Sequence, residues 1–125
     1  MDFATLKLSR KPNQFLMAPP GLCQMAKPHA DSPVFAMSAA ELMQRVEALA
    51  AGEARVTVAK KAPDGLSATF VARSKVFRFP DIIDVAAQPH GEGGSTLAIY
   101  SRARYGVRDF GVNRARIENW ISRLK

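Results

Sequence analysis

The side chains best suited to binding chemistry in this sequence are cations that recur at alternate positions in two strand-like segments. Guanidinium and ammonium groups attract anions, and an arginine can hold a carboxylate or a phosphate through two parallel hydrogen bonds. Because alternate side chains of a strand share one face, the two segments would present their cations on the same side of a sheet. We therefore predict an anion-binding surface made of Arg73, Lys75, Tyr100, Arg102 and Arg104.

The spacing of the remaining reactive residues does not indicate catalysis or metal binding. Asp109 lacks a histidine, a second carboxylate or a nucleophile at a spacing that general acid–base chemistry uses. The histidines, His29 and His90, are far apart, and the single cysteine, Cys23, excludes an internal disulfide and a multi-cysteine metal site. We therefore predict that the protein has no catalytic residues, no metal and no cofactor, and that Cys23 is buried or idle.

A second set of polar residues has the spacing of a junction between a strand and a helix. The Asp109 carboxylate can accept the Gly111 N–H in an Asx turn, glycine adopts backbone angles that other residues resist, and Asn113 is a favourable N-cap. We predict that these three residues fix the geometry of the junction. Asp109 is accordingly interpreted as a turn-forming residue rather than a catalytic carboxylate.

Arg114 and Arg116 complete this second set and lie in the first turn of the predicted helix. Cations there oppose the helix macrodipole, at a cost of a few tenths to about 1 kcal/mol each. An ion pair within the fold offsets such a cost, and so does a bound anionic ligand. The carboxylates considered for pairing are Asp81, Asp84, Asp109 and, for Arg114 alone, Glu118.

An amphipathic C-terminal helix is one of the elements that position the anion-binding residues and the junction residues. Ile117, Trp120, Ile121 and Leu124 recur at i, i+3, i+4 and i+7, which places them in one apolar stripe. The strand predicted before it, residues 97–105, directs its odd-numbered side chains to one face and its arginines to the other. We therefore predict that Trp120 is buried between this helix and the sheet.

The middle of the chain predicts a helix followed by strands. Residues 38–41 (Ser-Ala-Ala-Glu) form a capping box, which starts a helix that ends near Gly52. Residues 54–61 and 66–73 alternate on either side of a Pro-Asp-Gly turn, and residues 81–87 precede the strand at 97–105. We predict an α+β fold in which a four-stranded antiparallel meander carries the N-terminal and C-terminal helices on one face. The other face of the sheet is predicted to be open.

Residues 1–37 precede these elements and carry five of the eight prolines: Pro12, Pro19, Pro20, Pro28 and Pro33. Proline fixes one backbone angle and lacks the N–H that helices and sheets need. We predict that residues 1–37 form an extended arm with little regular structure, packed on a single domain of residues 38–125. The first ten or so residues of the arm are predicted to be loose.

The charge distribution favours an acidic partner. The 125-residue chain has a net charge of +7; residues 54–80 hold six bases against Asp64 alone, and residues 97–125 hold seven against Asp109 and Glu118. Basic surface favours nucleic acid, phospholipid or phosphate ligands. No apolar run has the length of a membrane span, and the N-terminal residues lack the hydrophobic core of a signal peptide. We expect no transmembrane segment and a cytoplasmic location for the chain as written.

Residues 101–116, Ser-Arg-Ala-Arg-Tyr-Gly-Val-Arg-Asp-Phe-Gly-Val-Asn-Arg-Ala-Arg, resemble the bacterial and plastid family catalogued as domain of unknown function 1499. In that family a serine- and arginine-rich strand leads to a D-x-G-x-N-R-x-R motif and a terminal helix. Residues 10–14 resemble its Pro-Asn segment, and residues 77–81 its Phe-x-Phe-x-Asp segment. Relatives carry a cysteine where this chain has Ala18, which leaves Cys23 unpaired. The resemblance implies exported or membrane-anchored relatives and supplies no activity.

These observations lead to two expectations for function and disfavour a third. The first is a non-enzymatic accessory or binding domain whose basic sheet face meets an acidic protein surface or an anionic lipid surface. The alternative is a domain that holds a small anionic or amphipathic molecule between the sheet and the C-terminal helix, with Arg102 or Arg104 at the mouth of the pocket. An enzyme is least favoured. Nucleic acid is disfavoured because Tyr100 is the one aromatic residue predicted on the basic face.

Overall fold

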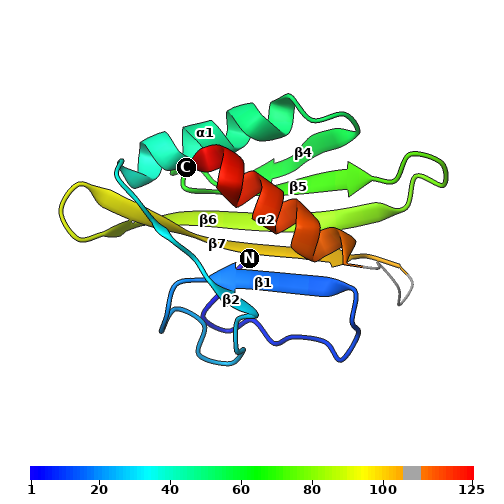
Figure 1. The fold of residues 1–125 in the computed structure, drawn as a ribbon, viewed down its shortest axis with the longest axis horizontal. Helices are drawn as coiled ribbons and strands as arrows, with labels where there is room; N and C mark the ends of the chain where they lie inside the picture. Colours follow the sequence, from blue (N-terminus) through cyan, green and yellow to red (C-terminus); the bar gives the residue numbers. More distant parts are fainter. Residues whose placement is uncertain (106–110) are drawn as a thin grey trace.

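A computed structural model describes residues 1–105 and 111–125. Within these residues the chain forms two helices and one seven-stranded sheet (Figure 1). Strands β4 (Val56–Lys61), β5 (Ser67–Arg73), β6 (Pro80–His90) and β7 (Gly94–Ala103) pair in sequence order, each antiparallel to the next. The predicted α+β fold and its antiparallel meander are therefore confirmed.

The predicted number of four strands is wrong, because the N-terminal arm adds three strands to the sheet. Strand β1 (Gln14–Ala18) pairs antiparallel with the C-terminal half of β7, and β3 (Val34–Phe35) pairs antiparallel with its N-terminal half. Strand β2 (Ala30–Asp31) lies parallel to β1. Residues 15–18 of β1 are buried on both faces of the sheet. A strand covered on both faces is continuously apolar, so it lacks the alternation used to recognise the other strands.

Both helices pack on one face of this sheet. Helix α1 (Ala39–Ala51) begins at the predicted capping box, where Ser38 Oγ accepts the Glu41 N–H at 3.1 Å. Helix α2 (Val112–Leu124) buries the predicted stripe of Ile117, Trp120, Ile121 and Leu124. Side chains from both helices belong to one apolar cluster, which includes Phe70, Ile83 and Ile99 of the sheet.

The burial of Trp120 is confirmed. Its side chain is 3% exposed, and its ring lies edge-on to Phe70 with 6.1 Å between the ring centroids. Such a contact joins the C-terminal helix to the centre of β5. The helix therefore completes the core rather than lying loosely on it.

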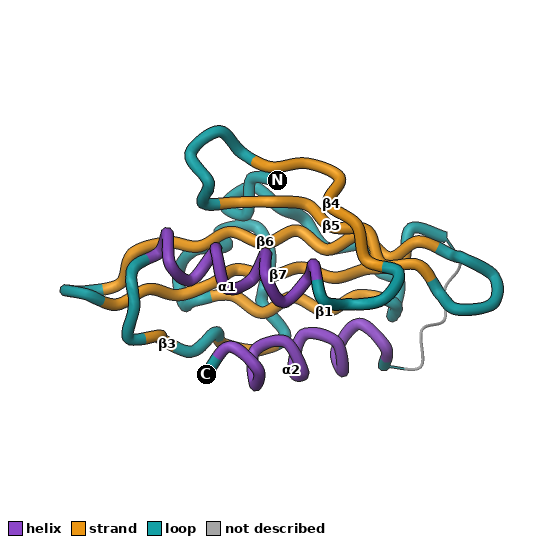
Figure 2. The backbone as a smooth tube through the Cα atoms, turned by 90° about the horizontal axis from the view of Figure 1, so that it is seen from above, coloured by secondary structure: helices purple, strands orange, loops and turns teal. Residues whose placement is uncertain are grey.

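The opposite face of the sheet was predicted to be open, but the N-terminal arm covers part of it. The N-terminus lies on the side of the sheet away from α2 (Figure 2). Phe3 is buried there, although the first residues were predicted to be loose. The arm contributes Phe3, Leu6, Leu8, Leu22, Cys23 and Ala26 to a second apolar cluster against Leu16, Ala18, Ala86, Ala98 and Tyr100. The face stays exposed at Thr57, Arg73 and Arg104. The sheet carries apolar residues on this side too, and the arm removes them from water.

Candidate functional site

The strand register brings Arg73 and Arg104 to one end of the sheet. Arg73 of β5 is the Cα partner of Pro80 in β6, and the Arg104 N–H donates to the Pro80 carbonyl at 3.0 Å. The two arginines therefore flank Pro80, one on each side. Both are exposed. This is the juxtaposition that the alternation of the two segments predicted.

Lys75 lies beyond the end of β5, in the loop of residues 74–79 that leads to β6. The loop is closed by two hydrogen bonds of 3.0 Å: the Ser74 N–H donates to the Phe79 carbonyl, and the Phe79 N–H donates to Ser74 Oγ. Arg73 Nη1 donates to the Arg78 carbonyl at 3.1 Å. Arg78 has a φ of 58°, a left-handed conformation that costs a non-glycine residue about 1–2 kcal/mol. These bonds hold the loop in a defined shape.

Large apolar side chains on and beside this loop are exposed to solvent. The exposed fractions are 76% for Val76, 74% for Phe77, 59% for Phe79 and 61% for Tyr105. The rings of Phe77 and Phe79 stack with their centroids 5.5 Å apart. We call this part of the surface the basic–aromatic end; it consists of Arg73, Lys75, Arg78, Arg104, Val76, Phe77, Phe79 and Tyr105. The anion-binding surface predicted from the sequence included none of residues 76–79.

The cations of the basic–aromatic end have no acidic partner among residues 1–105 and 111–125. The ion pairs of this part of the chain involve other bases: Arg45, Lys61, Arg102, Arg114, Arg116 and Arg123. Arg73, Arg78 and Arg104 instead line a hollow of about 550 Å³ together with Phe79 and Tyr105. Arg104 Nε donates to the Tyr105 hydroxyl at 3.3 Å. Within the described residues, no ion pair neutralises the positive charges of this end.

Tyr100 and Arg102 do not lie on an open face of the sheet, and this corrects their predicted location. Tyr100 is 5% exposed, and its hydroxyl donates to Gln14 Oε1. Burial raises the pKa of this hydroxyl, as does the negative charge of Asp84, while Arg102 acts in the opposite direction. Arg102 Nη1 lies 2.6 Å from Asp84 Oδ2, and its guanidinium lies over the Tyr100 ring. Alternation predicted the correct face for both residues, but the arm covers that face.

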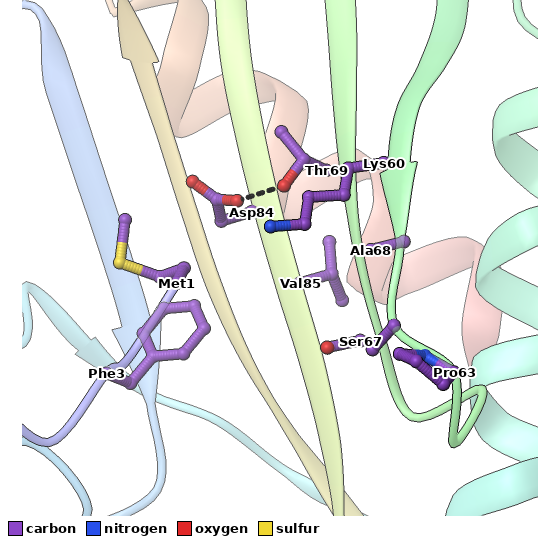
Figure 3. A pocket seen from close by; sticks show the side chains of 10 residues that line it. Met1, Phe3, Lys60, Pro63, Ser67, Ala68, Thr69, Asp84 and Val85 are labelled. Atoms are coloured by element: carbon purple, nitrogen blue, oxygen red, sulfur yellow. Dashed lines mark hydrogen bonds between the residues drawn. The ribbon is translucent and has the colours of Figure 1, made fainter.

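Asp84 lies at a pocket of about 230 Å³ on the face away from the helices (Figure 3). Figure 3 shows Lys60 extending toward Asp84, with Phe3 across the pocket. The Asp84 carboxylate accepts hydrogen bonds from Thr69 Oγ1 at 2.5 Å and from Arg102 at 2.6 Å. These two donors compensate the charge of a side chain that is 6% exposed. The arrangement stabilises an ion pair within the fold.

The junction before α2 differs in one respect from the prediction. Helix α2 begins at Val112 and its N-cap is Gly111, so the expected role of Asn113 as N-cap is wrong. Gly111 has a φ of 80°, which glycine adopts without the steric penalty of other residues. Asp109, the predicted turn-forming residue, lies outside the residues that the structure describes. The helix thus starts two residues earlier than the N-cap preference of asparagine indicated.

Asn113 instead lies fully buried inside the first turn of α2, where it joins three parts of the fold. Its Oδ1 accepts hydrogen bonds from Ser101 Oγ of β7 at 2.6 Å and from Arg116 Nη1 at 2.9 Å. Its Nδ2 donates to the carbonyl of Asn13, just before β1, at 3.1 Å. The asparagine of the N-R-x-R motif therefore fixes α2 against β1 and β7.

Arg116 and Arg114 have separate partners. Arg116 pairs with Asp81 at 3.0 Å, and both side chains are 17% exposed. Arg114 pairs with Glu118 at 2.6 Å on the outer surface of the helix. Asp81 and Glu118 were among the carboxylates considered from the sequence. In the described structure each arginine has an acidic partner near the helix start, which offsets the unfavourable position of a cation there.

A separate hollow of about 430 Å³ lies between α2 and the ends of β4 and β5. Its lining includes Arg55, Arg73, Arg116 and Trp120. This hollow lies where a pocket between the sheet and the C-terminal helix was predicted, but neither Arg102 nor Arg104 is among the residues lining it.

Cys23 has no disulfide partner and is partly buried in the second apolar cluster. Burial raises the pKa of its thiol, so the thiol is protonated at neutral pH. Among residues 1–105 and 111–125, no three histidine, cysteine, aspartate or glutamate side chains are grouped to hold a metal ion. None of the helices in this part of the chain is long and apolar enough to span a membrane.

These features define a small α+β protein whose sheet carries two helices on one face, an N-terminal segment on the other, and a basic–aromatic end. The family described as protein of unknown function (DUF1499) matches residues 7–124, so the chain belongs to this family. The resemblance drawn from residues 101–116 is thereby confirmed. No curated protein matches the chain.

Proposed function

We propose that this protein is a non-enzymatic accessory or binding domain whose basic–aromatic end meets an acidic surface. The observation that carries the proposal is that Arg73, Lys75, Arg78 and Arg104 gather at one end of the sheet. None of the four forms an ion pair within the part of the chain that the structure describes. Unneutralised cations repel one another, so an acidic surface placed against them gains Coulomb energy at several positions at once.

The chemical groups at this end support binding rather than reaction. Guanidinium and ammonium groups stay charged at neutral pH and attract anions, while the exposed phenylalanines offer apolar contact. The bond from Arg73 Nη1 to the Arg78 carbonyl fixes the backbone at Arg78. The Arg78 guanidinium forms no ion pair within the described residues. A preformed surface of this kind loses little conformational entropy when it binds.

Reversing two of these charges tests the proposal. The variant Arg73→Glu/Arg104→Glu should bind heparin and a polyglutamate peptide at least about tenfold more weakly than the wild type, a change of ~1.4 kcal/mol. Binding by the wild type should also weaken as sodium chloride is added, because salt screens exposed charges. Isothermal titration calorimetry at two salt concentrations measures both effects.

The matched control is Lys7→Glu/Lys27→Glu, which changes the net charge equally at exposed cations outside the basic–aromatic end. It should retain most of the affinity. Equal losses in the two double variants would mean that net charge alone drives binding, and would contradict a defined site. Thermal melts of both variants establish that any loss is not caused by unfolding.

A second candidate function is the binding of a small anionic or amphipathic molecule. The hollow of about 430 Å³ beside α2 favours it, because arginines and apolar side chains share its lining. Arg116 is already neutralised by Asp81, which leaves Arg55 and Arg73 as the cations available to an anion. We rank this function second because Arg55 Nε donates to the Arg73 carbonyl at 3.3 Å. One donor of the Arg55 guanidinium is therefore already used within the fold.

A further inference from the structure

We propose that the acidic surface is an anionic lipid bilayer, and that the loop of residues 74–79 inserts Val76, Phe77 and Phe79 among the lipid headgroups. This inference rests on the proposed function and names the partner of the same site. The loop joins β5 to β6 and projects beyond one end of the sheet (Figure 1). A projecting loop can enter a bilayer surface without any change in the sheet behind it.

The apolar content of the loop is the first argument. Val76, Phe77 and Phe79 are each more than half exposed, at 76%, 74% and 59%. Soluble proteins seldom expose neighbouring large apolar side chains unless the patch binds something. The phenylalanines of the strands, Phe15, Phe35 and Phe70, are all buried in the first apolar cluster. Phe77 and Phe79 differ from them because their rings face solvent.

The order of charged and apolar residues is the second argument. Lys75 and Arg78 alternate with Val76, Phe77 and Phe79 along the loop, and Arg73 and Arg104 lie behind them at the strand ends. Aromatic rings favour the boundary between headgroups and acyl chains, and the cations beside them pair with lipid phosphates and with anionic headgroups. An acidic protein surface would satisfy the cations but would need a matching apolar hollow for three protruding side chains.

The rigidity of the loop is the third argument. The two bonds between Ser74 and Phe79, and the bond from Arg73 to the Arg78 carbonyl, fix the loop before it meets a partner. The stacked rings of Phe77 and Phe79 are presented together at 5.5 Å. Insertion therefore requires little ordering of the backbone, which favours binding.

Vesicle binding separates this inference from the proposed function. Sedimentation is measured with vesicles of phosphatidylcholine alone and of phosphatidylcholine with phosphatidylserine in equal parts. The wild type should bind the anionic vesicles and not the neutral ones. Phe77→Ser should weaken vesicle binding by about tenfold or more, because apolar burial is lost, while its affinity for heparin is unchanged. Val58→Ser is the control, since Val58 is exposed but lies outside the basic–aromatic end.

A second readout uses Phe77→Trp, whose emission should shift to the blue on anionic vesicles and be quenched by lipids brominated on their acyl chains. The native Trp120 is buried and should contribute a constant background. Heparin binding without vesicle binding would overturn the lipid assignment and point to an acidic protein. If Phe77→Ser still binds the anionic vesicles and the emission of Phe77→Trp does not shift, loop insertion would be overturned while the proposed function would stand. If the wild type binds neither heparin nor anionic vesicles, the proposed function would be overturned as well.

Discussion

Replacing Trp120 with alanine is expected to lower the free energy of unfolding by ~3–5 kcal/mol, a large share of the stability of a small domain. Trp120 is 3% exposed and is central to the stripe that joins α2 to the sheet. Removing the indole leaves a cavity against Phe70, whose ring it meets edge-on. The surrounding helices and strands can collapse into that cavity only in part, so the contact energy is not recovered.

Urea denaturation followed by circular dichroism measures this loss. Val112→Ala is the matched control, since Val112 is in the same helix but 48% exposed. Its free energy of unfolding should stay within about 0.5 kcal/mol of the wild-type value. An unchanged midpoint for Trp120→Ala would mean that α2 does not complete the core.

Replacing Arg102 with glutamate is expected to lower the free energy of unfolding by ~2–4 kcal/mol. The change removes the partner of a carboxylate that is 6% exposed and puts a second carboxylate beside it. We set the loss below that of a fully buried pair because the Arg102 side chain is 25% exposed, so water screens part of the interaction. Thr69 still donates to Asp84, but one neutral donor does not replace a guanidinium.

Arg104→Glu is the matched control, because Arg104 is exposed and forms no ion pair within the described residues. Its thermal midpoint should stay close to that of the wild type. Equal midpoints for the two variants would contradict the interpretation of Arg102 as a structural ion-pair partner.

The parts of the fold that the sequence predicted well have a clear periodicity. The capping box before α1 and the stripe around Trp120 are local patterns, and each describes an element with one buried face. The same holds for β5, where alternate residues enter the first apolar cluster. Strand β7 is buried on both faces, but small and polar residues among its apolar ones preserve an alternation in the sequence. Strand β1 escaped recognition because residues 15–18 are buried on both faces, so nothing alternates.

The candidate site could be predicted only in part, because alternation assigns a side chain to a face without saying what covers that face. Arg73 and Arg104 were placed correctly, whereas Tyr100 lies beneath the N-terminal arm and Arg102 is drawn into a pair with Asp84. The left-handed conformation of Arg78 could not be predicted, because the residue is neither glycine nor asparagine. This conformation shapes the loop that presents Phe77. Asn113 was misread because Gly111, two residues earlier, takes the cap position.

The most direct test of the basic–aromatic end maps the amide resonances of the protein by NMR as a polyglutamate peptide is added. The largest shifts should fall in residues 73–80 and 103–105, which the register of β5, β6 and β7 brings together. Largest shifts at Arg55, Ala115 and Asn119 would assign binding to the hollow beside α2 instead. Shifts spread evenly over all exposed cations, Lys7 and Lys27 included, would contradict a defined binding surface.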